Sequence, residues 1–406
     1  MFEADRLLPD SQSRVRQSDL DRLDRLRALS PTASDRTALL CDLALRGLSQ
    51  MYSGSGAFVQ TMRGVATGSG MTARPEGDSL RYAAIVSLGL ACAEEGAQRR
   101  VLKGETAADL AATCARRATS ASDLGAIAIS AWAAAEIAGT FPADLLARLA
   151  ALLEDGRPVE TLACAWALTA ALAAQHLGDT ALLKQKAATR LRSGQAKSGL
   201  FPHTLPGQGW ARAHIGSFAD QVYPIQALAR LSVADADLAA LEAAEACAAQ
   251  ICALQGHAGQ WWWHYDTRDA SVAEGYPVYS VHQHAMAPMA LLELAEAGGQ
   301  SRWDAIIRGL GWLDDPPEAP VSLVSDADSI IWRKIGRGDP AKAVRSVSAL
   351  TTALKPGWHL PGLDLAFPPD RVDYECRPYE FGWLLYAWCS GGVVEQLRPA
   401  PDGPHA

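Results

Sequence analysis

Apolar residues recur at intervals of three and four along most of the chain, which is the spacing of one face of an α-helix. Alanine and leucine dominate these segments, and runs of β-branched residues are rare. The pattern therefore predicts an all-α protein. The predicted helices cover residues 36–50, 78–95, 105–118, 122–138, 142–154, 158–177, 180–195, 217–231, 235–254, 278–297, 301–313, 326–335, 340–354 and 378–390.

The predicted helices are of two kinds. One kind is amphipathic, with charged residues on one face, and the other is apolar almost all round. A helix that is apolar on every side has to be buried on every side. The alternation of the two kinds indicates two concentric layers, an outer and an inner ring of helices. The amphipathic helices are 105–118, 142–154, 180–195 and 340–354, and the apolar ones are 122–138, 158–177 and 280–297.

A short motif follows two of the amphipathic helices. Gln255 to Trp261 fits the pattern Gln-x3-Gly-x-Trp, and Gln195 to Phe201 fits it with phenylalanine in place of tryptophan. Gly357-Trp358 is a degenerate third copy. Glutamine can bond free backbone groups at a helix end, glycine permits a turn, and the aromatic ring can pack over the helix terminus. We interpret the motif as a fastener at the ends of outer helices.

The motif resembles the QW repeats of squalene cyclase and other class II terpene cyclases, which are α/α toroids. Toroids of this shape also occur in six-hairpin glycosidases, polysaccharide lyases and sugar epimerases. The segment from Tyr276 to Leu294, an aromatic–Ser–His-Gln pattern opening an apolar helix, is similar to the uronyl C5-epimerase and sugar 2-epimerase toroids. The resemblance implies an (α/α)6-type toroid built from two concentric helix rings.

Length and charge narrow the possibilities. The chain has 406 residues, of which 49% are hydrophobic, so it can bury a large core as one toroid domain. We predict a charged lead-in over 1–34, the toroid over 35–395 and a disordered tail over 396–406. The net charge is −8 with both signs interspersed, which argues against a nucleic-acid partner.

The sequence also predicts where the protein resides. No apolar stretch resembling a secretory signal occurs near the N-terminus, and the longest apolar run, Leu162 to Ala174, is too short to span a bilayer. The eight cysteines are scattered and form no Cys-x-x-Cys pair. We therefore predict a cytoplasmic protein with reduced cysteines and no transmembrane segment. The sequence does not indicate its oligomeric state.

Long loops between outer and inner helices carry most of the reactive side chains. In a two-ring toroid these loops emerge at the same end, so loops 51–77, 196–219, 256–279 and 355–377 should meet over one cavity. Six of the nine histidines lie in or beside them: His203, His214, His264, His282, His284 and His359. Histidine with carboxylates can supply general acids and bases, and aromatic rings can stack on sugars or shield a carbocation.

We predict two groups of site residues from these loops. The candidate catalytic residues are His264, Asp266, Glu274, Tyr279, His282 and Glu375. The candidate substrate-binding residues are His203, Trp210, Arg212, His214, Asp220, Trp262, Tyr276, His284, Trp358, Arg377 and Tyr379.

Other interpretations of these residues remain open. His282 and His284 could bind a metal with His264 or Asp266, but residues i and i+2 do not share a helix face. We therefore predict no metal and no cofactor, and a structural role for at least one of the two. Glu375, Arg377 and Glu380 could instead form a salt-bridge lattice.

The acidic motif of the class II cyclases has a partial counterpart here. Asp326-Ala-Asp328 resembles it, but Ser329 stands where that motif has a further aspartate. The predicted position of this segment is a short late helix. The acidic motif therefore gives only weak support to a terpene-cyclase activity.

Three functions fit the sequence. The first is a carbohydrate-active enzyme, an epimerase, lyase or hydrolase, whose small-molecule or oligosaccharide substrate can contain uronic acid. An epimerase or lyase would use Tyr279, His282 and His264 as acid and base with a cation from Arg212 or Arg377. A hydrolase would pair Asp266 or Glu274 with Glu375. The second is a terpene cyclase or prenyl-binding enzyme, which requires an apolar cavity with one strong acid. The third is a non-catalytic binding scaffold.

Overall fold

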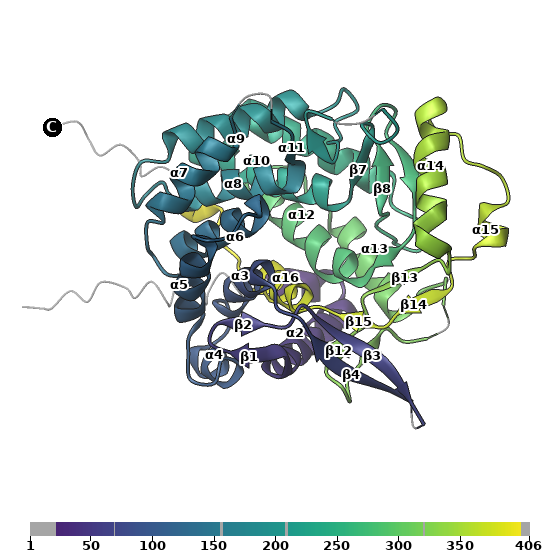
Figure 1. Ribbon diagram of the computed structural model, residues 1–406, viewed down its shortest axis with the longest axis horizontal. Coiled ribbons are helices and arrows are strands. Elements are labelled where there is room, and N and C mark those ends of the chain that lie inside the picture. Colours follow the sequence, from purple (N-terminus) through teal and green to yellow (C-terminus); the bar gives the residue numbers. More distant parts are fainter. Residues whose placement is uncertain (1–21, 69, 155–156, 208–209, 320, 399–406) are drawn as a thin grey trace, which may run out of the picture.

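A computed structural model describes residues 22–68, 70–154, 157–207, 210–319 and 321–398. Within these residues, six outer helices alternate along the chain with six inner ones (Figure 1). The outer helices are α2 (Pro31–Met51), α5 (Ala107–Ala118), α7 (Ala143–Leu152), α9 (Ala181–Gly194), α11 (Leu238–Ala253) and α13 (Trp303–Asp314). The inner helices are α3 (Leu80–Leu90), α6 (Leu124–Glu136), α8 (Thr161–Ala174), α10 (Ala219–Ala234), α12 (Ala287–Glu296) with the π-helical turn η1 (His282–Met286) before it, and α16 (Pro378–Cys389).

The inner helices form a closed ring. Each packs against the next in chain order, and α16 returns to pack against α3. Their sequences explain this position, because α6 is buried at every residue from Gly125 to Ala135, whereas α5 buries only one face. The all-α, two-ring architecture predicted from the hydrophobic pattern is therefore confirmed, and so is the (α/α)6-type toroid that the family resemblance implies.

The two complete copies of the glutamine motif fasten neighbouring outer helices to each other. The Nε2 of Gln195 donates to the carbonyls of Gly199 (2.8 Å) and Ala243 in α11 (2.8 Å). The Nε2 of Gln255 donates to Gly259 (3.0 Å) and Ala305 in α13 (2.9 Å). Both motif aromatics are fully buried.

The glycine of the motif is required by its backbone. Gly259 has φ +96°, and a Cβ there would lie 2.0 Å from the carbonyl oxygen of Arg308 in α13. Only glycine accommodates that conformation and that approach at little cost. The motif is thus a helix-to-helix fastener, as its sequence predicted.

Short strands join the outer-to-inner loops at one end of the toroid. The first three-stranded sheet has the order β15-β3-β4 (Glu375–Cys376, Thr61–Thr67 and Gly70–Glu76), with all pairings antiparallel. The second is β7-β8-β9 (Ile215–Ser217, His264–Asp266 and Ser271–Glu274), and the third is β10-β13-β14 (Val278–Tyr279, Lys334–Gly336 and Arg371–Asp373). Loops far apart in sequence are therefore held together above the inner ring.

The predicted helix over 326–335 is wrong. This segment contains β12 (Ile330–Ile331), which pairs with β11 (Val324–Ser325), and the beginning of β13. Ser329 has φ +54°, which breaks a right-handed helix, and the β-branched isoleucines favour a strand. Consequently the Asp326-Ala-Asp328 motif lies in a turn.

The predicted amphipathic helix 340–354 exists, but it does not belong to the outer ring. It is the helix α14 (Ala343–Leu354), preceded by the 3-10 turn η2 (Pro340–Lys342), and it packs against β9 at the loop end of the molecule. Figure 1 shows α14 and the short α15 (Leu363–Ala366) at the edge of the toroid. Both belong to the long connection between α13 and α16.

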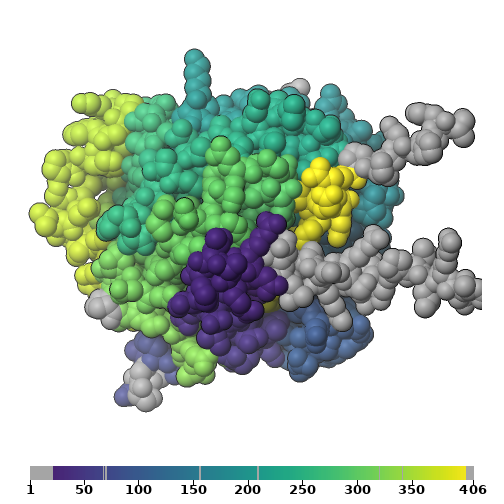
Figure 2. Space-filling view, turned by 180° about the vertical axis from the view of Figure 1, so that it is seen from behind, coloured from purple at the N-terminus to yellow at the C-terminus, as the bar shows by residue number. Residues whose placement is uncertain are grey.

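Other described segments complete the fold. Residues 22–29 are helical, and the buried Arg22 donates to Glu296 (2.7 Å) and to the carbonyl of Ala387 (2.6 Å). Figure 2 shows the purple N-terminal part of the described chain on the rear face. The domain boundaries remain predictions, and residues 1–21 of the lead-in and 399–406 of the tail lie outside the described residues. None of the described helices combines the length and apolar character needed to cross a bilayer.

Candidate functional site

A cavity of about 210 Å³, here called the central cavity, lies where the inner helices begin. The first turns of α3, α8, α10, η1 and α16 face it, together with loop residues above them. Among the described residues, no aspartate or glutamate side chain lines it. Its aromatic, histidine and arginine lining consists of Arg81, Tyr82, Trp166, Phe218, Tyr223, Trp263, Tyr279, His282, Arg333 and Tyr379.

Tyr279 is the residue around which this lining is arranged. Tyr279 is the last residue of β10, and His282, the first residue of η1, follows shortly after it in the chain. Its ring centroid lies 4.8 Å from that of His282, and the guanidinium carbon of Arg333 lies 4.9 Å from it. Lys334 approaches the ring at 5.4 Å. A phenol, an imidazole and a guanidinium therefore meet at one wall.

His282 is buried, and burial lowers its pKa to about 3, so the imidazole is neutral at neutral pH. Its Nδ1 has no hydrogen-bond partner among the described residues. The π-helical turn that carries it widens the helix start locally, and such turns are frequent at functional sites. The neutral ring can therefore exchange a hydrogen bond or a proton with a molecule in the cavity.

Arg333 connects the cavity to a buried carboxyl group. Its Nε lies 3.4 Å from Oε1 of Glu380, in the first turn of α16, and its Nη1 lies 3.8 Å from Oε2 of Glu375. Glu380 is fully buried, and burial raises its pKa to about 8 despite the positive charge of Arg333. Arg333 is thus held from behind while its guanidinium faces Tyr279.

The structure brings together three of the predicted site residues, Tyr279, His282 and Tyr379, in the lining of the central cavity. His264 lies directly behind the wall, because its ring stacks on Trp263 with centroids 4.0 Å apart. Burial, followed by the positive charges of Arg212 and Arg345, lowers the pKa of His264.

Asp220 lies beside the central cavity at the start of α10. Its Oδ2 accepts hydrogen bonds from the backbone N–H of Ser217 (2.8 Å) and from its hydroxyl (2.6 Å). The Nδ1 of His203 lies 3.0 Å away, and this hydrogen bond raises the pKa of His203. The other carboxylate oxygen is buried without a partner among the described residues.

Asp220 and His282 occupy equivalent positions in successive inner helices. Each is followed by a buried glutamine that holds the backbone of a motif aromatic. Gln221 accepts from the N–H of Phe201 at 2.8 Å, and Gln283 accepts from the N–H of Trp261 at 3.3 Å. The repeat that builds the rings therefore also places these two polar residues at the loop end.

Several predicted site residues lie outside the central cavity. Asp266 is paired with Arg268 at 2.7 Å, and the Nε2 of His214 lies 3.0 Å from Oγ1 of Thr352 in α14. The buried contact of His214 ties the segment before β7 to α14. His284 is fully buried in the inner ring.

At the surface, Arg212, Trp210 and Trp358 are exposed. In the last loop, Glu375 is paired with Arg377 (3.0 Å), which is one contact of the lattice interpretation, and also with Arg63 (2.9 Å). Glu380, the third member of that lattice, lies beside Arg333 instead. The predicted roles of the residues outside the central cavity remain predictions. Among the described residues, no group of three or more histidine, cysteine, aspartate or glutamate side chains is arranged to hold a metal ion.

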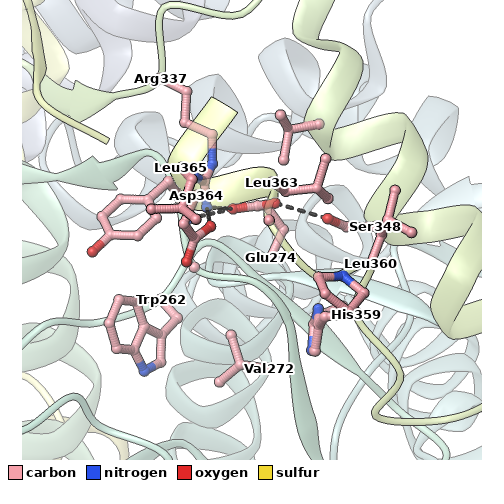
Figure 3. A pocket seen from close by; sticks show the side chains of 16 residues that line it. Trp262, Val272, Glu274, Arg337, Ser348, His359, Leu360, Leu363, Asp364 and Leu365 are labelled. Carbon is pink, nitrogen blue, oxygen red and sulfur yellow. Dashed lines mark hydrogen bonds and ion pairs between the residues drawn. The ribbon is translucent and has the colours of Figure 1, made fainter. Parts of the chain in front are cut away.

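Glu274, Tyr276 and Trp262 line two further cavities, of about 320 Å³ (the middle cavity) and about 500 Å³ (the outer cavity). Glu274 and Tyr276 belong to both, and Trp262 to the outer one. Glu274 accepts from the hydroxyl of Ser348 (2.9 Å) and from Arg337 (3.2 Å), as Figure 3 shows. The backbone N–H of Tyr276 also donates to it (3.0 Å), so this carboxylate is already engaged by three donors.

The central cavity also contains residues that the sequence analysis missed. Arg333 lies in the predicted helix 326–335, which the structure does not contain. Trp166 and Tyr223 lie within the predicted helices 158–177 and 217–231, and neither is among the candidate site residues. Arg81 and Tyr82 open an inner helix, a position where polar residues could have been suspected. Arg81 lies 5.4 Å from the ring centroid of Trp166 and is paired with Asp123 at 2.7 Å.

No protein-family model and no curated protein matches the sequence. Solved structures do match by shape. An unsaturated glucuronyl hydrolase specific for heparin superposes with a TM-score of 0.54 at 13% identity, covering 94% of this chain and 100% of the other. A structure named for UGL and dGlcA-Glc-Rha-Glc superposes with a TM-score of 0.55 at 15% identity, covering 86% of this chain and 95% of the other. Unsaturated glucuronyl hydrolase from Streptococcus agalactiae gives 0.51 at 11% identity, covering 87% and 90%.

At these identities the likeness shows the fold. It extends over nearly the whole of both chains and supports the toroid assignment. It gives no support to the terpene-cyclase part of the predicted resemblance.

Proposed function

We propose that this protein is a carbohydrate-active enzyme that transfers a proton at the carbon next to the carboxylate of a uronic acid unit, as an epimerase or a lyase. One observation carries the proposal. Tyr279 lies between Arg333 and His282 at the wall of an aromatic cavity whose described lining contains no carboxylate.

The lining suits an acidic sugar. Aromatic rings such as Trp166, Trp263 and Tyr223 offer faces on which a sugar ring can stack. A guanidinium over an aromatic ring can direct in-plane N–H groups at a carboxylate, and Arg333 lies over Tyr279 with its Nε toward Glu380 and its Nη1 toward Glu375. The solved structures of similar fold include hydrolases named for a glucuronyl unit, which supports the same substrate class.

The reaction needs an acid, a base and a cation. A base removes the proton from C5, and the electron pair of that C–H bond moves into the carboxylate, where Arg333 stabilises the added negative charge. Return of a proton to the opposite face gives the C5 epimer. Alternatively, the electron pair forms the C4–C5 double bond and expels the C4 substituent, whose oxygen takes a proton from the acid. Tyr279 and His282 are the two proton-transfer groups.

A bound substrate would also adjust His282. Its pKa of about 3 reflects burial and the nearby positive charge of Arg333. A carboxylate entering the cavity would favour the protonated imidazole, because an opposite charge stabilises the charged form. Substrate binding would therefore raise this pKa and make the ring a better proton acceptor.

The other candidate functions fit less well. A hydrolase requires two carboxyl groups about 5 to 10 Å apart across the scissile bond, and the described lining of the central cavity has neither. A terpene cyclase would need Asp326 or Asp328 in the cavity. Asp326 is instead 85% exposed and paired with Arg46, and Asp328 accepts from Ser325.

The test is incubation with uronate polysaccharides of several configurations in D2O. An epimerase returns a solvent deuteron to C5, so NMR should show deuterium there, whereas a lyase product has lost its C5 hydrogen and should absorb in the ultraviolet through its new C4–C5 double bond. We expect Tyr279→Phe to abolish both signals, whereas the matched variant Tyr374→Phe, outside the cavity, should retain whichever signal the unaltered protein gives. New reducing ends with neither deuterium at C5 nor ultraviolet absorption would identify a hydrolase. Binding without any turnover across the panel would favour the scaffold function.

A further inference from the structure

We propose that the substrate is an acidic oligosaccharide, and that Arg345 in the middle cavity binds the carboxylate of a second sugar unit. This inference rests on the proposed function, because it extends the same site. It names a binding residue outside the central cavity and a minimum substrate length of two acidic units.

The three cavities form a row with common walls. Trp263 and Tyr279 line both the central and the middle cavity. Glu274, Tyr276 and Arg337 line both the middle and the outer cavity. A chain that places one unit against Tyr279 therefore has a lined path for its neighbours toward α14 and α15, the region seen in Figure 3.

Arg345 is positioned for an anion. It lies on α14, and its guanidinium carbon is 5.3 Å from the ring centroid of Trp263. Its Nε is buried without an acceptor, and among the described residues no carboxylate lies within ion-pair distance of its guanidinium. Stacking on an indole fixes the plane of a guanidinium and leaves its donors free to bind a carboxylate in bidentate fashion.

The remaining charges of the middle cavity leave Arg345 available. Its three acids are already engaged: Glu274 by Arg337 and Ser348, Asp373 by Lys334 at 2.9 Å, and Asp339 by the backbone N–H of Val344 at 2.8 Å. The cations lining it are Lys334, Arg337, Lys342, Arg345 and Arg371. Five cations against three engaged acids leave an excess of positive charge.

Trp263 sets the distance between the two units. Its side chain lines both the central and the middle cavity, and Arg345 of the middle cavity lies over its ring. An acidic group held by Arg345 would therefore belong to a unit directly adjacent to the one against Tyr279. A sulfate ester presents the same kind of charged oxygens, so the test has to separate a carboxylate from a sulfate.

The test is calorimetric binding of galacturonate, glucuronate and mannuronate as monomers, dimers and trimers. Methyl-esterified dimers serve as neutral controls. A neutral disaccharide that carries a sulfate ester tests whether Arg345 binds a sulfate in place of a carboxylate. We expect the acidic dimer to bind at least tenfold more tightly than the monomer, and the ester to lose this gain. Arg345→Gln should remove the gain without changing monomer binding, and Arg345→Lys should keep part of it. Arg100→Gln, an exposed charge on α4 (Glu95–Val101), should behave as the unaltered protein.

The outcomes separate the two proposals. Monomer binding and C5 exchange without any gain from a second unit, or equal binding by Arg345→Gln, would overturn this inference alone. A gain given only by the sulfated disaccharide would overturn the carboxylate assignment. Failure of every uronate to bind and to exchange would overturn the proposed function and this inference with it.

Discussion

The guanidinium carbon of Arg333 lies 4.9 Å from the ring centroid of Tyr279, and its Nε lies 3.4 Å from the buried carboxyl of Glu380. One side chain therefore joins the aromatic wall of the central cavity to the first turn of α16. The cation is held in place by its two neighbours and does not depend on solvent for its position. This arrangement suits a group that has to stabilise charge developing on a substrate carboxylate.

Replacement of Arg333 by lysine should lower kcat/KM by about tenfold to a hundredfold, because lysine keeps the charge but loses the planar donor pair. In free energy this corresponds to about 1.4–2.7 kcal/mol of transition-state stabilisation. Initial rates of C5 exchange for an epimerase, or of ultraviolet absorption for a lyase, measure the effect, with melting temperature as the check on folding. Arg100→Lys provides a matched change on the exposed surface. Unchanged rates for Arg333→Lys would remove Arg333 from the chemistry.

Glu380→Gln should change how stability depends on pH. Burial raises the pKa of Glu380 from 4.5 to about 8. The folded state therefore keeps a proton that the unfolded state has lost between these values, so this contribution is present at acid pH and is lost as pH rises through 8. Glutamine does not titrate, so the variant lacks this pH-dependent contribution. The stability of the variant relative to the unaltered protein should therefore increase from pH 5 to pH 8.

Urea unfolding at pH 5, 6.5, 8 and 9 measures this difference. Plotted against pH, the difference in unfolding free energy between Glu380→Gln and the unaltered protein should rise with a slope that approaches about 1.4 kcal/mol per pH unit between the two pKa values. Glu395→Gln, at an exposed carboxylate paired with Arg398, should give a flat difference. A flat difference for Glu380→Gln as well would mean that Arg333 keeps Glu380 ionised in the folded protein.

Helix periodicity was sufficient to predict the two rings, because complete burial leaves a distinct sequence pattern. The helices α6 and α8 are apolar on every side and belong to the inner ring, whereas α5 has a charged face and belongs to the outer one. The strands were missed for a physical reason. The strand β15 is two residues long, and its partner β3 lies near the other end of the chain, so no local period identifies it.

The site could be predicted in part. Tyr279 and His282 stand where a polar loop enters an apolar helix, and this contrast is visible in the sequence. Trp166 gave no such contrast, because an aromatic residue that faces a cavity from an apolar helix has the same sequence surroundings as one in the core. Arg333 depended on the pairing of β13, which only the three-dimensional arrangement reveals.

Gln255→Ala should destabilise the protein by about 1–3 kcal/mol, because it leaves the buried carbonyl groups at the junction of α11 and α13 without their donor. Gln195→Ala should have a similar effect at the junction of α9 and α11, since its two hydrogen bonds have the same pattern. Denaturant unfolding measures both. The exposed Gln300 provides the control, and its replacement by alanine should be neutral. Equal stability of all three variants would contradict the fastener interpretation.

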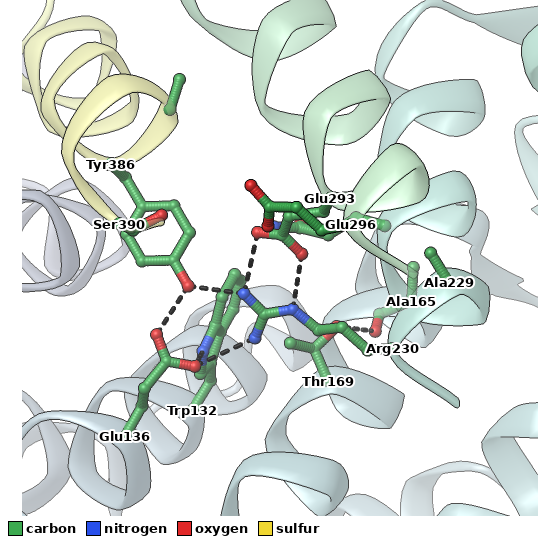
Figure 4. Close-up of polar contacts among 12 residues, drawn as sticks. Trp132, Glu136, Ala165, Thr169, Ala229, Arg230, Glu293, Glu296, Tyr386 and Ser390 are labelled. Atoms are coloured by element: carbon green, nitrogen blue, oxygen red, sulfur yellow. Dashed lines mark hydrogen bonds and ion pairs between the residues drawn. The ribbon is translucent and has the colours of Figure 1, made fainter. Parts of the chain in front are cut away.

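A buried ionic network closes the inner ring about two helical turns below the central cavity. Arg230 of α10 bonds Glu293 of α12 at 2.7 and 2.9 Å and Glu136 of α6 at 2.9 Å, as Figure 4 shows. Its guanidinium carbon lies 4.9 Å from the ring centroid of Trp132, and the hydroxyl of Tyr386 in α16 donates to Glu136 at 2.6 Å. One arginine thus connects four inner helices.

Arg230→Met should cost about 3–5 kcal/mol of folding free energy, because it leaves Glu293 fully buried without its countercharge. Adding Glu293→Gln should restore part of the loss, since glutamine needs no countercharge and Gln226 remains as a partner. Urea unfolding of the two single variants and the double variant gives the coupling energy. The C5 exchange rate per folded molecule should stay unchanged, because Arg230 does not line the central cavity. If the losses of stability add in the double variant, Arg230 and Glu293 contribute to stability independently. If the C5 exchange rate falls, the ionic network takes part in the catalytic site.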